Sequence, residues 1–244
     1  MRLSEHVHLV GSGWLGYSLS DRHDGHVYLV DGGTASFLVD AGSGLDTARV
    51  AAWIEAAQAP PVTHILVTHG HADHAAGAGA LARLLGAEIW ASPEVARMLA
   101  DADEVTTGLA VARSAGVYPA TLSLRPTEVH RQLGDETFTI GAATVRCMPT
   151  PGHAVGHACY LVDVGGARAV FTGDLVFARG RVAVLGTTET DIGALRDSIA
   201  AVAATAPGAL FPGHGSVALS GADRHLAAAL DAFAHGQLPP GLLS

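Results

Sequence analysis

The stretch THGHADH at residues 68–74 places three imidazoles and one carboxylate within six residues. Imidazole and carboxylate side chains are ligands that suit zinc and neighbouring first-row metals. A loop that joins a strand to a helix can turn alternate side chains toward one point, and the small Gly70 and Ala72 let the backbone coil tightly around ions. The stretch therefore predicts a metal site with four candidate ligands: His69, His71, Asp73 and His74.

Three more candidate ligands occur later in the chain, each directly after a predicted strand. They stand in TPGH at residues 150–153, FTGD at residues 171–174 and FPGHG at residues 211–215. In each motif a glycine frees the backbone to aim the side chain that follows it. The further candidates are His153, Asp174 and His214, whereas the remaining histidines lack a ligand-like setting and are expected to be packed or solvated.

The order of these motifs resembles the metallo-β-lactamase superfamily, and PGHAVGH at residues 151–157 resembles a form common in its glyoxalase II-like branch. The resemblance covers the chain from about His26 to His214. It implies an α/β (α+β) fold, an αββα sandwich of four layers with the site at one edge of the sheets. It also implies two metal ions, one held by His69, His71 and His153, the other by Asp73, His74 and His214, with Asp174 bridging them.

Two other residues match positions that lie behind the ligands in that family. Asp40 belongs to the turn LVDAG at residues 38–42, and metal-bound histidines commonly donate their free N–H to such a carboxylate. A turn-stabilising aspartate before glycine is a second, compatible interpretation. His157 is expected to support the ligands or to be structural.

Short apolar runs bounded by glycine predict strands, and capped or alanine-rich periodic runs predict helices. The expected strands span residues 26–30, 36–40, 64–68, 87–91, 136–140, 143–148, 158–164, 168–172 and 208–211. The expected helices span residues 46–57, 75–85, 191–204 and 221–235. Sheet packed on sheet with helices outside is the simplest arrangement of these elements.

The 244 residues contain no Pro/Ser-rich or low-complexity linker, which predicts a single domain over residues 1–244. Residues 93–126 separate the two halves and predict one or two helices followed by a loop. This segment is either an insertion that caps the site or a structural connection. Its apolar side chains suit an acyl or aromatic substrate and suit core packing equally: Met98, Leu99, Val105, Leu109, Val111, Val117 and Tyr118.

Composition narrows the possible partners. The net charge is −9, and all fourteen basic residues are arginines scattered singly, so neither nucleic acid nor an anionic membrane is expected to bind. The chain starts without a basic segment and a long apolar run, and no window approaches the roughly 20 apolar residues of a membrane span, which predicts a cytoplasmic protein. Cys147 and Cys159 are expected to be reduced and buried. The oligomeric state is not predicted.

A two-metal site of this kind predicts hydrolysis. Two zinc ions that share a water would lower its pKa toward about 7, which supplies a bridging hydroxide at neutral pH. The hydroxide would attack a carbonyl polarised by one ion, and Asp73 would relay a proton as the intermediate collapses. The expected substrate is a small molecule with a thioester, ester or lactone bond.

Two alternatives share these motifs. An iron-dependent persulfide dioxygenase would use one Fe²⁺ held by His69, His153 and Asp174, and mixtures of zinc, iron and manganese also suit these ligands. An acyl-homoserine lactonase resembles the chain in its ligand motif but usually carries a tyrosine three residues beyond the bridging aspartate, where Phe177 stands here. The commonest zinc β-lactamases have a cysteine ligand before the last histidine, so antibiotic hydrolysis is not expected with aspartate at 174.

Overall fold

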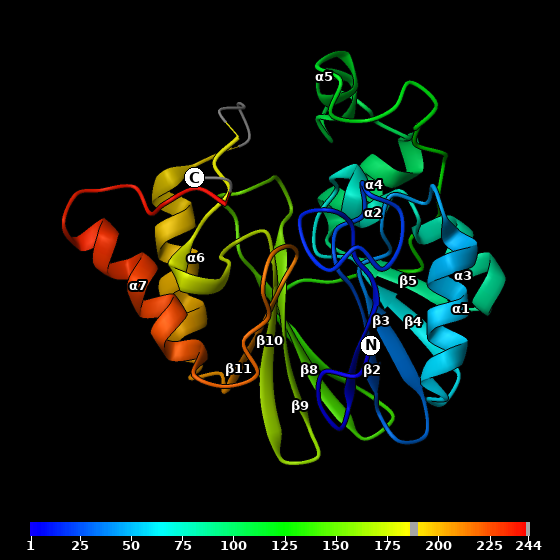
Figure 1. Ribbon diagram of the computed structural model, residues 1–244, viewed down its shortest axis with the longest axis horizontal. Helices are drawn as coiled ribbons and strands as arrows, with labels where there is room; N and C mark the ends of the chain where they lie inside the picture. The colour runs from blue at the N-terminus through cyan, green and yellow to red at the C-terminus, as the bar shows by residue number, and fades with distance from the viewer. Residues whose placement is uncertain (186–189, 243–244) are drawn as a thin grey trace.

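The computed structural model describes residues 1–185 and 190–242, and these residues contain two β-sheets packed face to face (Figure 1). The strands of the first sheet are, in spatial order, β1 (Val7–Gly11), β2 (Val27–Asp31), β3 (Ser36–Val39), β4 (Val62–Leu66), β5 (Glu88–Ala91) and β6 (Arg131–Gln132). The strands of the second are, in spatial order, β11 (Ala209–Pro212), β10 (Ala167–Gly173), β9 (Ala158–Val164), β8 (Ala143–Pro149) and β7 (Glu136–Ile140).

Apolar side chains of the strands alternate between the two faces of each sheet, as the two-residue period of a strand requires. In β2, Tyr28 and Val30 join the core between the sheets, whereas Val27 and Leu29 pack on the outer side. Tyr160 of β9 contributes to the core between the sheets from the opposite sheet. Because both faces are buried in this way, polar side chains gather in the loops at the strand ends.

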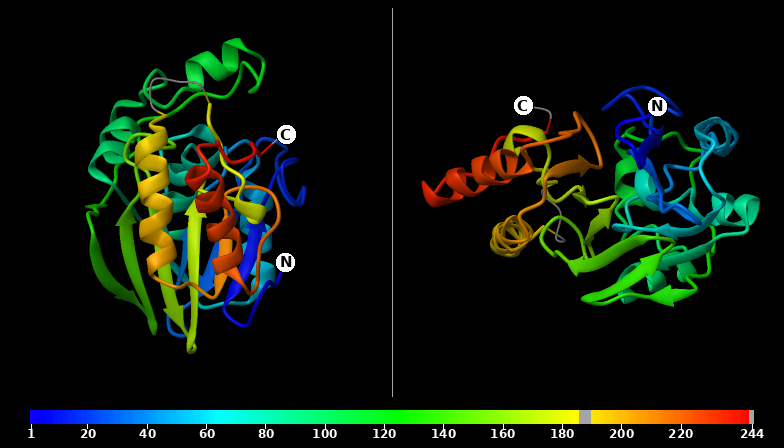
Figure 2. Two further views of the ribbon diagram at one scale, coloured as in Figure 1. Left: turned by 90° about the vertical axis from the view of Figure 1, so that its left-hand side faces the viewer. Right: turned by 90° about the horizontal axis from the view of Figure 1, so that it is seen from below.

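Helices cover the outer face of each sheet (Figures 1 and 2). The first sheet is covered by α1 (Thr47–Ala57) and α3 (Ala78–Leu85), the second by α6 (Ile192–Ala204) and α7 (Ala222–Ala234). Leu81 is buried in the core between the first sheet and its helices, and Leu226 is buried in the core between the second sheet and its helices. The expected αββα sandwich is confirmed. No helix within the described ranges is long and apolar enough to cross a membrane, and the cytoplasmic location stays a prediction.

The strand directions bring the sequence motifs to one edge. β8 and β10 are both antiparallel to β9 and therefore run the same way, and β11 is parallel to β10. In the first sheet β3 and β4 are parallel. Hydrogen bonds join the sheets near this edge: Tyr160 Oη donates to the Val67 carbonyl at 2.8 Å, Ala158 N–H donates to the Thr68 carbonyl at 2.8 Å, and Tyr28 Oη donates to the Pro212 carbonyl at 2.6 Å.

The structure differs from the sequence prediction at several elements. The strands β1 and β6 and the short 3-10 helix Ala178–Gly180 were not predicted. The helix expected over 75–85 begins only at Ala78, as α3, and a separate short helix, α2 (Ala72–Ala75), precedes it. The break lies at Gly77, where a Cβ atom would stand 2.2 Å from the Ala41 carbonyl oxygen. Gly77 N–H also donates to the Gly42 carbonyl, so contact with the turn after β3 interrupts the helix.

Residues 93–126 form α4 (Pro93–Asp101), α5 (Leu109–Ser114) and a long loop. Met98, Leu99 and Leu109 are buried, which is the core-packing role expected for part of this segment. Val105 and Val117 are 79% and 58% exposed. The apolar residues of the segment therefore divide between the core and the surface.

The two cysteines are free and buried, on the neighbouring strands β8 and β9. They do not face each other, because Cys147 is opposite Tyr160 and Cys159 is opposite Met148. Burial raises the pKa of each thiol to about 12. We therefore expect an aromatic disulfide reagent near pH 8 to modify neither thiol of the folded protein and both after denaturation. Rapid modification of the folded protein would contradict this burial.

Candidate metal centre

All seven candidate ligands lie together at the sheet edge. Residues 68–74 follow β4 and enter α2, while His153 follows β8, Asp174 follows β10 and His214 follows β11. Their side chains form three overlapping groups whose ligand atoms lie within 4.8 Å of one another: His69, His71 and His153; His69, His74 and Asp174; Asp73, His74 and His214.

The first group consists of three imidazoles. His71 Nδ1 lies 3.0 Å from His69 Nε2 and 3.1 Å from His153 Nε2. His153 Nδ1 lies 3.0 Å from the carbonyl oxygen of Ala183, to which it can donate. That hydrogen bond leaves His153 Nε2 with a lone pair directed at the other two imidazoles.

The group of Asp73, His74 and His214 combines two imidazoles with a carboxylate. His214 Nε2 lies 3.0 Å from Asp73 Oδ2 and 3.3 Å from His74 Nε2. Asp174 lies between this group and the first, because its Oδ2 is 3.5 Å from His214 Nε2 and 3.8 Å from His153 Nε2. One carboxylate therefore faces both groups.

Asp40 fixes the orientation of His74, as the resemblance implied. Its Oδ2 accepts a hydrogen bond from His74 Nδ1 at 2.8 Å, which turns His74 Nε2 toward the cluster. The same carboxylate accepts from Thr68 N–H at 2.7 Å and from Thr68 Oγ1 at 2.9 Å. Asp40 has φ of 63°, a left-handed conformation that aspartate tolerates better than most residues.

His157 supports the backbone of Asp174 and lies behind the cluster. Its Nε2 accepts the Asp174 N–H at 3.3 Å, so its Nδ1 carries the proton and donates to Thr150 Oγ1 at 2.9 Å. Burial, followed by the charge of neighbouring His153, lowers the pKa of His157 well below its ordinary value. A neutral His157 is therefore a fixed acceptor.

The imidazoles differ in protonation. Burial and neighbouring imidazoles lower the pKa of His69 well below its ordinary value and that of His153 to about 4. Both are neutral at pH 7, which is the form that binds metal. Burial also lowers the pKa of His74, but nearby carboxylates, Asp174 first among them, outweigh burial and raise it well above its ordinary value. Metal binding at His74 therefore releases a proton.

The residues present fit metal ions. Asp174 Oδ1 is buried and makes no hydrogen bond with any residue in the described ranges, although His74 Nε2 stands 3.4 Å away. Burying a carboxylate oxygen without a hydrogen bond costs free energy unless the oxygen is paired with, or coordinates, a cation. Glycine at 213 leaves room beside this buried oxygen, because a Cβ atom there would stand 2.3 Å from Asp174 Oδ1.

A family model described as the metallo-beta-lactamase superfamily matches residues 20–224, a range that contains all seven residues. The chain belongs to the metallo-β-lactamase superfamily. The resemblance to the superfamily drawn from the sequence motifs is thereby confirmed, whereas the glyoxalase II-like branch stays a prediction. The αββα sandwich is the fold that its solved structural neighbours share.

Curated relatives of this superfamily member are longer proteins. The lactamase-like protein adaB of Aspergillus niger is 31% identical over 199 residues, which are 78% of this chain and 50% of that protein. An atrochrysone carboxyl ACP thioesterase of Aspergillus fumigatus is 28% identical over 196 residues, which are 79% of this chain and 38% of that protein. The chain thus spans about half or less of the length of these relatives.

Solved metallo-β-lactamases share the fold at low identity. A Cronobacter sakazakii enzyme described by its HARLDQ motif superposes with a TM-score of 0.74 at 19% identity, covering 97% of this chain and 96% of that one. Native FEZ-1 metallo-β-lactamase from Legionella gormanii superposes with a TM-score of 0.66 at 18% identity, covering 87% and 78%. At these identities the likeness concerns the fold alone.

Two aromatic residues, Phe177 and Tyr118, have candidate ligands as neighbours, His214 and Asp73 respectively. Phe177 is buried, and its ring centroid lies 6.2 Å from that of His214. A phenyl ring without a hydroxyl therefore occupies the position where lactonases usually carry a tyrosine. Tyr118, from the loop after α5, lies beside His23, with ring centroids 5.9 Å apart, and burial followed by the charge of Asp73 raises its pKa. The sequence predicts only a capping or packing role for Tyr118, because no local motif indicates an interaction with a residue 45 positions earlier.

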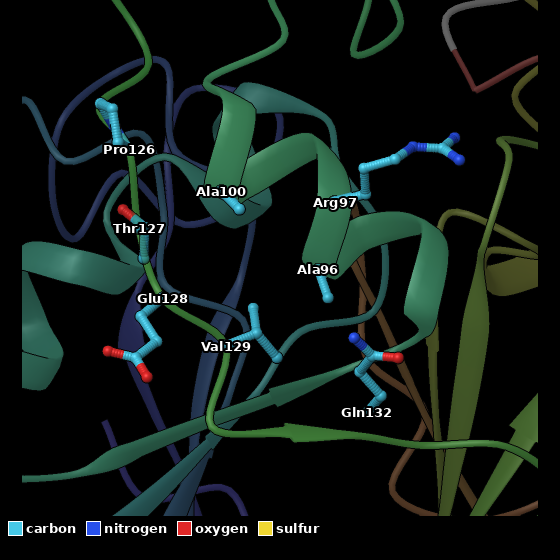
Figure 3. Close-up of a pocket in the computed structure, with 8 residues that line it drawn as sticks. All are labelled: Ala96, Arg97, Ala100, Pro126, Thr127, Glu128, Val129 and Gln132. Carbon is cyan, nitrogen blue, oxygen red and sulfur yellow. The ribbon is translucent and has the colours of Figure 1, made fainter.

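A surface hollow of about 440 Å³ lies elsewhere, between α4 and the segment before β6 (Figure 3). Figure 3 shows the Arg97 side chain directed away from the other labelled residues. The hollow contains none of the seven candidate ligands, which separates it from the metal centre. Its lining residues are Ala96, Arg97, Ala100, Pro126, Thr127, Glu128, Val129 and Gln132.

Proposed function

We propose that the chain is a hydrolase with two metal ions, zinc foremost, that cleaves a thioester, ester or lactone bond of a small molecule. The observation that carries the proposal is the position of Asp174 between two groups of ligand atoms. A carboxylate in that position suits a bridge between two cations. One ion would be held by His69, His71 and His153, the other by Asp73, His74 and His214, with Asp174 shared.

The residues around the centre have separate roles in this proposal. When bound, the ions would supply a hydroxide nucleophile at neutral pH and polarise the substrate carbonyl. Asp40 and His157 hold their partners rigidly through the hydrogen bonds described above. The Asp73 side chain is 14% exposed, against 9% for Asp174 and 3% for Asp40. Asp73 is thus the carboxylate best placed to take a proton and return it to the leaving group.

A thioester is the first substrate class to test, because one relative is a thioesterase of an acyl carrier protein. We also propose that residues 93–126 cover the centre within a single-domain protein. In Figure 1, α5 stands at the same end of the molecule as α2, which carries Asp73 and His74. The exposed Val105 and Val117 give this segment apolar surface suited to an acyl group.

The test combines metal analysis with a substrate panel. Protein purified without added metal is analysed by mass spectrometry, and the same preparation is assayed on an acyl N-acetylcysteamine thioester, p-nitrophenyl acetate and a γ-lactone. We expect about two zinc ions per chain. Hydrolysis should disappear with a strong chelator and return with zinc.

Other outcomes would redirect or overturn the proposal. About one iron per chain, with oxygen consumed in the presence of a persulfide, would favour the dioxygenase. A preference for the lactone would favour the lactonase alternative, despite Phe177. Protein that binds no metal after incubation with excess zinc would exclude the proposed hydrolase.

A further inference from the structure

Gly25 and His26, the two residues before β2, join two of the ligand motifs. Gly25 N–H donates to the Asp73 carbonyl at 2.9 Å, and His26 N–H donates to the Gly213 carbonyl at 2.7 Å. A Cβ atom at position 25 would stand 2.9 Å from His74 Cε1 and Nε2, so the backbone before β2 lies directly against that imidazole. This short segment therefore connects the THGHADH motif with the FPGHG motif.

The His26 side chain makes a second contact with the FPGHG motif. Its Nε2 lies 2.9 Å from the carbonyl oxygen of Gly215. A carbonyl oxygen can only accept, so Nε2 carries the proton and donates it. Burial lowers the pKa of His26 to about 3, so the ring is neutral at pH 7 and has this one N–H to donate. One residue thus holds Gly213 and Gly215, the neighbours of His214 on both sides.

The backbone around His214 also has partners in two other segments. Gly215 N–H donates to the Leu15 carbonyl at 2.7 Å, and Gly213 N–H donates to the Gly173 carbonyl at 2.7 Å. Gly215 has φ of 74°, a left-handed conformation that glycine adopts without steric cost, so the chain turns directly after the ligand. These two hydrogen bonds join backbone to backbone, whereas the one from the imidazole can be removed by substitution.

Neighbouring rings fix the position of the His26 imidazole. Its ring centroid lies 5.6 Å from that of Tyr17 and 5.7 Å from that of Tyr28. Tyr28 is itself held, because its Oη donates to the Pro212 carbonyl at 2.6 Å. A Cβ atom at Gly16 would stand 2.2 Å from His26 Cε1, so the loop after β1 also lies against the ring. The imidazole is 1% exposed and has little room to turn away from the FPGHG motif.

We propose that His26 is a positioning residue for His214. Its backbone and ring N–H groups fix the carbonyls of Gly213 and Gly215. The direction of the side chain between them is thereby set, and its Nε2 lies 3.0 Å from Asp73 Oδ2. The inference rests on the proposed function, in which Asp73 and His214 help to hold the second of the two ions. Loss of a partner that orients a metal ligand typically lowers metal affinity or activity about 10–100-fold.

Two variants, His26→Phe and His26→Gln, separate the hydrogen bond from the packing. Phenylalanine keeps a planar ring but donates nothing to the Gly215 carbonyl, whereas the glutamine amide can donate from near the position of Nε2. Zinc is titrated into each metal-free protein against a chelating indicator. We expect His26→Phe to bind the second zinc about 10–100-fold more weakly and the first as the wild type does. His26→Gln should bind both ions as the wild type does.

The rate gives a second measure of the same effect. With zinc in excess, kcat of His26→Phe for p-nitrophenyl acetate should fall about tenfold while KM changes less than about twofold. His26→Gln should keep the wild-type kcat. Wild-type zinc affinity and kcat in His26→Phe would overturn the inference. Equal losses in the two variants, or equal weakening of both zinc ions, would mean that packing alone matters and would overturn it as well.

His64→Phe is the matched control. The His64 ring packs against Trp90, with ring centroids 4.4 Å apart, and its Nδ1 lies 2.7 Å from Thr63 Oγ1. The change removes ring nitrogens within β4, whereas the THGHADH motif follows the end of that strand. Zinc affinity and kcat of this variant should match the wild type.

The position of the His26 proton tests the geometry without metal and without a variant. Nuclear magnetic resonance of metal-free wild type with isotope-labelled histidine rings identifies which ring nitrogen carries the proton. We expect the proton of His26 on Nε2, as the hydrogen bond to the Gly215 carbonyl requires. A proton on Nδ1 would mean that the ring does not hold this carbonyl and would overturn the inference even if neither His26 variant folds.

The two levels of the proposal fail differently. If the wild type binds two zinc ions and hydrolyses the ester while His26→Phe equals it in zinc affinity and kcat, only the inference about His26 is overturned. If the wild type neither binds zinc nor hydrolyses the panel, the proposed function fails, and the positioning role fails with it.

Discussion

Replacement of Asp174 by asparagine is expected to reduce the metal content from about two ions per chain to fewer than one and to lower hydrolysis about a thousandfold. Asparagine keeps the shape but removes the charge that faces His74, His153 and His214. An amide cannot bridge two cations as a carboxylate can, and a thousandfold loss corresponds to about 4 kcal/mol of transition-state stabilisation. Metal analysis and kcat/KM for the thioester measure the two effects.

Asp197→Asn provides the matched control for that change. Asp197 is exposed on α6 and pairs with the neighbouring Arg196, so the same loss of charge occurs at an exposed ion pair rather than among the seven candidate ligands. Metal content and rate should stay at wild-type levels in this variant. If Asp174→Asn also kept two ions and full activity, the bridging role assigned to Asp174 would be wrong.

The αββα architecture was predictable because its determinants are local. Alternating apolar residues such as those of β2 set strand faces within five residues, and the motifs that end in His153 and Asp174 stand directly after strands. The short β6 was not predictable, since both its residues are exposed and carry no apolar alternation. The interruption at Gly77 depends on contact with the turn after β3, which no helical pattern contains.

The candidate site was predictable to the level of residue identity but not of geometry. The motifs predicted which side chains meet, because strands that end at one edge bring their loops together. They did not show that His71 faces the cluster with Nδ1 while His69 and His153 use Nε2. The packing of Tyr118 against His23 depends on how residues 93–126 fold, and the sequence left the role of that segment open.

Replacement of Asp40 by alanine is expected to lower the free energy of unfolding by about 3–5 kcal/mol. The change leaves the buried Thr68 N–H and the His74 Nδ1–H without their acceptor, and a buried unsatisfied donor costs about 1–3 kcal/mol. Alanine is also strained at a φ of 63°. Since domains are typically stable by about 5–15 kcal/mol, the loss is a large fraction of the total.

Asp40→Asn separates the contributions to this loss. Asparagine tolerates the left-handed conformation and keeps one acceptor oxygen, so it should cost less than alanine, about 1–3 kcal/mol. Urea unfolding with excess chelator compares the variants without a contribution from metal binding. Equal losses for alanine and asparagine would mean that the negative charge beside His74 matters more than the number of acceptors or the backbone conformation. An alanine variant as stable as the wild type would show that Asp40 does not stabilise the turn, and its role would then be confined to orienting His74.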